Sequence, residues 1–183
     1  RAGLWVPVEP SSMDYATVGG LVANNAGGAR SVKYGSVVHQ LRAVEGLFAD
    51  GTPFQWDLIS GLKTSTAWNK RIAALALRLQ TELPKMKLPE VAKISTGYRL
   101  EALGEFSERN LGGLLPLLAG SEGTLALFTS ITLRLVKKPA ARRTALLVLD
   151  SLAAAARSVP PLLIHRPAAI ELLDETAIRM ALE

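Results

Sequence analysis

Residues 16–28 contain the residue types that point most clearly to ligand chemistry. Four glycines and three alanines occur among these thirteen residues, so few side chains keep a ligand away from the backbone. Glycine also adopts positive φ, which lets successive N–H groups point into one concavity that attracts phosphate oxygens or the carbonyl edge of a flat heterocycle. Asn24 and Asn25 add amide groups, and Thr17 adds a hydroxyl. The segment predicts a binding loop, and a tight turn between two packed elements is the simpler alternative.

The spacing of these glycines differs from that of two common nucleotide-binding motifs. It matches neither G-x-G-x-x-G nor G-x-x-x-x-G-K-[ST], so a Rossmann turn and a Walker P-loop are set aside. A second glycine cluster, residues 118–125, has a similar composition, with the hydroxyls of Ser121 and Thr124 and the carboxylate of Glu122. Two such loops could clasp the two sides of one extended ligand.

The overall composition excludes several classes of protein. The 183 residues are 49% apolar and 20% charged, which is typical of a folded globular chain. The net charge is +5, but the basic residues are scattered and aromatic residues make up only 5%, so we expect no nucleic-acid partner. The sequence has no apolar run long enough to predict a membrane span. The absence of cysteine excludes disulfides, iron–sulfur clusters and thiolate zinc within this segment, and it fits a reducing cytoplasm.

The elements that must position the two loops can be predicted from local patterns. Residues 21–26 predict a short helix beside the first loop. Residues 41–49 and 52–56 predict two strands, because Asp50-Gly51 between them is a strong hairpin signal. After the second loop, residues 125–135 alternate apolar and polar, which predicts one long strand with its odd-numbered residues on one face.

The segment 64–83 has the apolar spacing of an amphipathic helix. Ser65 or Thr66 can cap its start and Pro84 stops it, and residues 85–93 then form a connector. The expected core-facing stripe consists of Trp68, Ile72, Leu75, Leu79 and Leu83.

Residues 137–140 are predicted to be a domain boundary. Beyond it we expect a strand at 144–149, a helix at 152–158 capped by Asp150-Ser151, a strand at 168–172 and a helix at 174–182.

The order and separation of several motifs resemble the FAD-linked oxidases with the fold of p-cresol methylhydroxylase (PCMH) and vanillyl-alcohol oxidase. The resemblance is closest to the branch of D-lactate, glycolate (GlcD-like) and D-2-hydroxyglutarate dehydrogenases. The matching motifs are Pro10-Ser11-Ser12, residues 16–20 (ATVGG), residues 23–28 (ANNAGG), Lys33-Tyr34-Gly35, Ala49-Asp50-Gly51, Thr96-Gly97-Tyr98 and residues 120–125 (GSEGTL).

The resemblance implies an α+β fold. Residues 1–138 would form the second, C-terminal half of a PCMH-type FAD-binding domain, a mainly antiparallel sheet flanked by helices. Residues 139–183 would form the beginning of the α+β substrate (cap) domain, truncated. We therefore expect the chain to be an excerpt whose partners are the missing N- and C-terminal portions of the same protein. The helix at 68–83 resembles an insert of larger members that carry an iron–sulfur module, so an electron-transfer partner is also expected.

The resemblance implies FAD as the cofactor and places eleven residues beside it. Those expected along its pyrophosphate, ribityl and flavin portion are Thr17, Gly19, Gly20, Asn24, Ala26 and Gly27. Those expected to border the same cofactor are Ser12, Tyr34, Gly35, Glu122 and Gly123. Tyr98 and Thr124 receive no firm role. The chain has two histidines: His39 is expected to pack, and His165 is expected in a loop. No metal site and no catalytic residue are assigned.

The implied reaction is the oxidation of a small 2-hydroxy acid such as D-lactate, glycolate or D-2-hydroxyglutarate. A hydride passes from the α-carbon to flavin N5 while a base takes the hydroxyl proton. A non-catalytic nucleotide-binding or interaction module on the same scaffold is the alternative, and a basic nucleic-acid binder is a third. Alone, the excerpt is expected to be inactive, to bind FAD poorly and to associate through exposed apolar surface, which allows a homo-oligomer. We expect a cytoplasmic location, either free in the cytoplasm or peripheral to the inner membrane.

Overall fold

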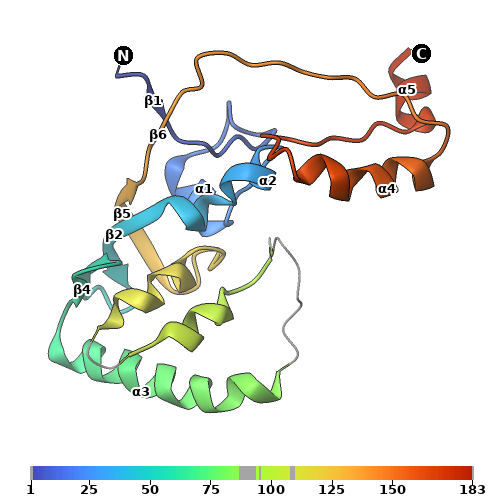
Figure 1. The fold of residues 1–183 in the computed structure, drawn as a ribbon. Helices are drawn as coiled ribbons and strands as arrows, with labels where there is room; N and C mark the ends of the chain where they lie inside the picture. Colours follow the sequence, from blue (N-terminus) through green and yellow to red (C-terminus); the bar gives the residue numbers. More distant parts are fainter. Residues whose placement is uncertain (1, 87–93, 95, 108–109, 183) are drawn as a thin grey trace.

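The computed structural model describes residues 2–86, 94, 96–107 and 110–182, and an antiparallel sheet with strand order β4-β3-β2-β5 lies at its centre (Figure 1). A second, two-stranded sheet pairs β1 with β6. The strands are β1 (Leu4–Trp5), β2 (Leu41–Phe48), β3 (Pro53–Asp57), β4 (Gly61–Lys63), β5 (Ala126–Leu133) and β6 (Val136–Lys137). The α-helices are α1 (Val18–Ala23), α2 (Ser31–Tyr34), α3 (Thr66–Glu82), α4 (Leu152–Leu163) and α5 (Glu175–Leu182). The 3-10 helices are η1 (Val37–Gln40), η2 (Leu83–Lys85), η3 (Leu100–Glu105) and η4 (Leu111–Leu118).

Antiparallel sheets flanked by helices confirm the predicted α+β class. Figure 1 shows α3 along one side of the central sheet and α4 and α5 on the far side of the molecule from α3. Within the described residues, no helix combines the length and the apolar character needed to cross a membrane.

The β2–β3 hairpin forms at the predicted turn. Gly51 has a φ of 81°, and Asp50 Oδ1 accepts a hydrogen bond from the backbone N of Thr52 at 2.9 Å. This bond to Thr52 holds the pKa of Asp50 below its ordinary value. The local turn chemistry alone was therefore sufficient to predict this hairpin.

Helix α3 packs on the sheet through stacked aromatic rings. The ring of Trp68 lies 4.1 Å from that of Phe48, and the ring of Phe48 lies 4.6 Å from that of Phe54, measured between centroids. Ser65 Oγ accepts a hydrogen bond from Trp68 N at 3.3 Å, which confirms the predicted cap. The cap and the aromatic stack together fix the start of the helix against the β2–β3 hairpin.

The buried face of α3 differs from the predicted stripe at two positions. Leu75 and Leu79 are 56% and 36% exposed, whereas Ala76 is 3% exposed. The buried face of the helix is therefore centred near Ile72 and Ala76, which are one turn apart. The other predicted positions pack against the core: Trp68, Ile72 and Leu83. Most of the predicted connector, residues 87–93, lies outside the described residues.

Strand β5 changes its core-facing side part-way along. The register pairs Phe128 with Gly46 and Ser130 with Glu45, so Thr129 is an extra residue opposite β2. Such a bulge shifts the phase of the alternation by one residue. Even-numbered side chains turn to the core before the bulge and odd-numbered ones after it. The prediction that all odd positions share one face is therefore wrong for the first half of this strand.

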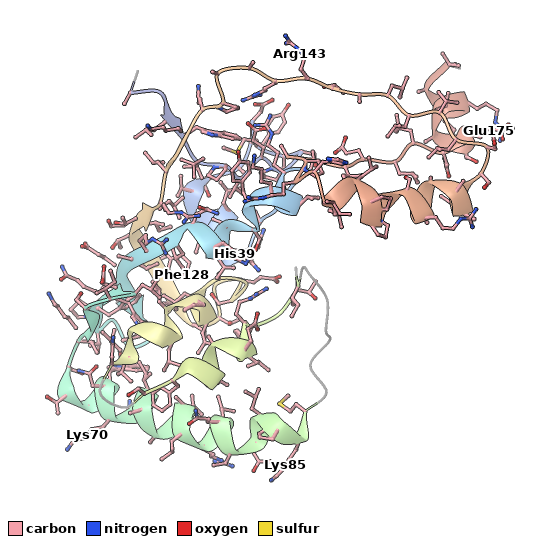
Figure 2. All side chains as sticks on the ribbon, in the orientation of Figure 1. His39, Lys70, Lys85, Phe128, Arg143 and Glu175 are labelled. Carbon is pink, nitrogen blue, oxygen red and sulfur yellow. The ribbon has the colours of Figure 1, made fainter. Side chains whose placement is uncertain are left out.

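The segment that follows β6 is largely exposed. Residues 139–150 form a long connection to α4, and Figure 2 shows Arg143 pointing outward from it. Ser151 Oγ accepts a hydrogen bond from Ala154 N at 3.1 Å, as the cap prediction required. The strands predicted at 144–149 and 168–172 are absent from the described structure. A strand needs a neighbour for its backbone N–H and C=O groups, and neither segment lies in a sheet of the described residues.

The turn between β3 and β4 makes folding stability sensitive to acid through Asp57. Asp57 Oδ1 accepts hydrogen bonds from Ser60 N at 2.7 Å and Ile59 N at 2.9 Å, and these bonds hold the pKa of Asp57 below its ordinary value of 3.8. A lowered pKa stabilises the fold above pH 3.8, and the contribution is lost as pH falls through the folded-state pKa. We expect Asp57→Asn to lower the melting temperature at neutral pH and to have little effect in strong acid. A difference in melting temperature that persists unchanged in acid would contradict this assignment.

Candidate functional site

The first glycine turn, residues 16–28, contains the short helix α1 near its start. Thr17 caps it, because Thr17 Oγ1 accepts a hydrogen bond from Gly20 N at 3.0 Å. Leu21 and Val22 are buried and anchor the helix in the core. The opposite side is open, since a Cβ added to Gly19 would meet no atom within 4 Å. The helix begins three residues before the predicted Leu21, because the Thr17 cap fixes its start.

The second glycine turn lies directly against the end of α1. Gly120 N donates to Val22 O at 3.2 Å, and Glu122 N donates to Ala23 O at 3.0 Å. Asn24 follows Ala23 in the chain and Gly123 follows Glu122, so the two turns are side by side. The central sheet makes this possible, because β5 leaves the second turn and pairs with β2. The structure thus confirms that the two turns lie together; that they hold one ligand remains a prediction.

The second turn exposes its backbone on the open side of this pair. Gly120, Glu122 and Gly123 have φ values of 85°, 49° and 81°. A Cβ added to Gly123 would meet no atom within 4 Å. Ser121 is buried, and its Oγ donates to Leu118 O at 2.8 Å, so it anchors the turn instead of facing a ligand.

The two adjacent asparagines have different roles. Asn25 is 2% exposed; its Oδ1 accepts from Val38 N at 3.3 Å and its Nδ2 donates to Ile94 O at 3.1 Å. It therefore ties three segments of the chain together. Asn24 is exposed, and its backbone N caps α1 by donating to Gly20 O at 3.0 Å. In the described part of the chain its side-chain amide makes no hydrogen bond, so it is free to meet a ligand.

Tyr34 and Gly35 make most of their contacts away from the second turn. The Tyr34 ring meets the edge of the Trp5 ring at 6.0 Å between centroids, and its carbonyl accepts from Gln40 Nε2 at 2.7 Å. Gly35 has a φ of 74°, and a Cβ there would lie 2.4 Å from His39 Nδ1. Among the described residues, no hydrogen bond joins Tyr34 or Gly35 to residues 120–124.

Three other predicted site residues lie along the chain on either side of α1. Ser12 is exposed, and its carbonyl accepts from Tyr15 N and Ala16 N, both at 3.0 Å, in the turn that leads into α1. Ala26 is half-buried, packs against the core, and accepts from Val37 N at 2.8 Å through its carbonyl. Gly27 is half-buried beside Gly28.

Gly28 has a structural role that the sequence pattern did not distinguish from binding. A Cβ at Gly28 would lie 1.9 Å from the Glu9 carbonyl oxygen, so the residue is required for close backbone packing. The motif that suggested a binding loop therefore also contains a packing position.

His39 packs on the backbone, as expected. Its ring lies over Gly35, and its Nδ1 is 3.2 Å from the Ser36 carbonyl oxygen. A carbonyl can only accept, so Nδ1 carries the proton in this contact. Figure 2 shows His39 close to the start of β2.

An open cavity of about 700 Å³ lies beside the β1–β6 sheet. Its lining includes Trp5, Glu9, Ser11, Lys138 and Arg142, and none of the residues of α1 or of the second turn. Neither this cavity nor the second one, at β4 and α3, contains the predicted site residues. At Gly19 and Gly123 the paired glycine turns present open space, and we call this side of the pair the open face.

Two family models match the chain. The FAD binding domain matches residues 1–56, which include α1 and the first glycine turn. The C-terminal domain of the FAD linked oxidases matches residues 138–183. The chain belongs to the FAD-linked oxidases. In this family the two domains indicate FAD as the cofactor, and the antiparallel sheets with flanking helices agree with a fragment of a PCMH-type FAD-binding domain.

Curated relatives share about a third or less of the residues of this chain. It is 29% identical to glycolate oxidase subunit GlcD of Bacillus subtilis over 179 residues, which cover 96% of the chain and 28% of that relative. It is 28% identical to D-2-hydroxyglutarate dehydrogenase of Escherichia coli over 189 residues, 99% of the chain and 18% of that relative. It is 33% identical to D-lactate dehydrogenase of Archaeoglobus fulgidus over 135 residues, 74% of the chain and 20% of that relative. The chain thus spans less than a third of the length of these relatives.

The open face is compatible with FAD. Gly19 and Gly123 leave space that a Cβ would otherwise fill, so backbone can approach a phosphate or a flavin edge closely. Asn24 supplies a side-chain donor at the border of this space. An anionic, donor-seeking ligand with a flat ring is therefore compatible with the groups present.

Proposed function

We propose that this chain is part of the cofactor-binding region of an FAD-dependent oxidoreductase, and that the whole protein oxidises a small 2-hydroxy acid such as D-lactate, glycolate or D-2-hydroxyglutarate. The observation that carries the proposal is the pair of backbone hydrogen bonds from Gly120 and Glu122 to the end of α1. They bring two distant glycine turns to one open face. The names of the relatives supply the substrate class.

In this proposal the residues of the chain bind and orient the cofactor. Gly19 and Gly123 let the backbone approach FAD, and Thr17 holds α1 in place by accepting a hydrogen bond from Gly20 N. Asn24 offers its free amide, and Glu122 holds the second turn through its backbone N–H. FAD, when bound, supplies the hydride acceptor for the reaction.

The proposal assigns no catalytic base to this chain. The Nδ1 of His39 is engaged with Ser36, and the ring packs on Gly35. Several features remain predictions: a catalytic base, the N- and C-terminal portions of the protein, an electron-transfer partner and the cytoplasmic location.

Anaerobic reduction of the bound flavin tests this function directly. The product of the complete open reading frame is purified, its flavin absorbance is recorded, and D-lactate, glycolate, D-2-hydroxyglutarate and the L-enantiomers of the chiral acids are added in turn. We expect loss of the oxidised-flavin absorbance with at least one of the D-acids or glycolate.

The other outcomes discriminate between the alternatives. Bound FAD that none of these acids reduces would favour the non-catalytic nucleotide-binding or interaction module. A folded protein that contains no flavin and takes up none when FAD is added would contradict the proposal as a whole.

A further inference from the structure

Ile94 and residues 96–99 lie against both glycine turns. Asn25 Nδ2 and Arg99 both donate to the carbonyl of Ile94, each at 3.1 Å. Gly97 lies so close to the second turn that a Cβ on Gly120 would be 2.5 Å from the Gly97 carbonyl oxygen. This third segment is therefore packed where the two turns meet.

Tyr98 extends the contact into the second turn. Its hydroxyl lies 2.6 Å from Thr124 Oγ1, and Thr124 Oγ1 in turn donates to the Ser121 carbonyl. A threonine hydroxyl has one hydrogen, so with that hydrogen given to Ser121 it must accept from Tyr98. The chain of hydrogen bonds therefore runs from Tyr98 through Thr124 into the backbone of the turn.

The second turn needs such support because its backbone is unfavourable. Glu122 has a φ of 49°, a left-handed conformation that residues with a Cβ adopt rarely. One side of the turn is held by the bond from Glu122 N to Ala23 O. The other side, at Thr124, is held by Tyr98, whose side chain is 43% exposed and reaches the turn from outside.

We propose that Tyr98 is a positioning residue for the cofactor: its hydroxyl, acting through Thr124, holds residues 120–124 in the conformation that receives FAD. The inference rests on the proposed function. Because Tyr98 acts through Thr124, removing either hydroxyl should release the same restraint on the turn. The losses of FAD affinity in the two single variants should therefore not multiply in the double variant.

The test measures the Kd for FAD of the complete protein by titrating the apoprotein and following flavin fluorescence. Tyr98→Phe removes only the hydroxyl and should weaken FAD binding about 3- to 10-fold, the usual worth of one hydrogen bond. Thr124→Val should have a similar effect, and Tyr98→Phe combined with Thr124→Val should be no weaker than the worse single variant. Thr124→Ser keeps the hydroxyl that Thr124→Val removes, so it should bind FAD as tightly as the unmodified protein. The absorbance spectrum of the bound flavin should shift in Tyr98→Phe and in Thr124→Val, and it should be unchanged in Thr124→Ser.

Tyr15→Phe is the matched control, because Tyr15 is 92% exposed and the same atom is removed. An unchanged Kd and flavin spectrum in Tyr98→Phe would overturn the inference, even if the melting temperature of the apoprotein fell. Multiplying effects in the double variant would overturn it too, since Tyr98 would then act by another route. Failure of the unmodified protein to bind FAD would instead refute the proposed function, and this inference with it.

Discussion

Gly120→Ala is expected to weaken FAD binding by more than about 100-fold and to lower the free energy of unfolding by about 2–5 kcal/mol. Gly120 has a φ of 85°, and a Cβ would lie 2.5 Å from the Gly97 carbonyl oxygen and 3.6 Å from Asn25 Cβ. The nearest obstacle is backbone, which cannot swing aside as a side chain can. The second turn or the backbone at Gly97 must therefore shift, which strains the bond from Gly120 N to Val22 O. Denaturant unfolding and FAD titration of the complete protein measure the two effects.

Gly51→Ala is the matched control for backbone strain. Gly51 has a φ of 81°, but a Cβ there would meet no atom within 4 Å. The substitution should cost only the left-handed conformation, about 1–2 kcal/mol, and leave FAD binding intact. If Gly120→Ala proves no more harmful than Gly51→Ala, the close approach of Gly97 to the second turn has no energetic weight.

Gly19→Ala is expected to change stability and cofactor binding in opposite directions. Gly19 lies within α1 with open space where a Cβ would be, so alanine should raise the free energy of unfolding by up to about 1 kcal/mol. The same methyl group would occupy the space assigned to FAD. Losing one hydrogen bond to a charged group costs about 1.5–3 kcal/mol, which corresponds to about 10- to 100-fold weaker binding.

Gly104→Ala is the matched control for adding a methyl group at a glycine that has open space around it. A Cβ on Gly104, in η3, also meets no atom within 4 Å, and this glycine lies outside the predicted site. It should leave the Kd for FAD unchanged. A Gly19→Ala protein that is stable and binds FAD as tightly as the unmodified one would mean that this side of α1 does not face the cofactor.

Local chemistry predicted the parts of the fold that depend on few residues. The turn at Asp50–Gly51 and the caps at Ser65 and Ser151 are each set by one side chain and its neighbours. The phase change in β5 was not predictable in this way, because the bulge at Thr129 exists only in the pairing with β2. The exposure of Leu75 likewise depends on which face of α3 the sheet covers.

The candidate site was predicted in composition but not in detail. The glycines, hydroxyls and amides marked both turns, yet sequence alone could not tell that Asn25 is buried while Asn24 is exposed. The difference follows from the backbone of Asn25, which has a φ of 46° and turns its side chain toward Val38 and Ile94. The position of Tyr98 against Thr124 also needed the tertiary structure, since 26 residues separate them.

Hydrogen–deuterium exchange of the complete protein, with and without saturating FAD, tests most directly whether the two turns bind one ligand. We expect exchange to slow in both segments, residues 18–24 and 120–124, with the same dependence on FAD concentration, while the β2–β3 hairpin at 41–57 is unchanged. Protection of one turn without the other, or of neither, would contradict the central claim.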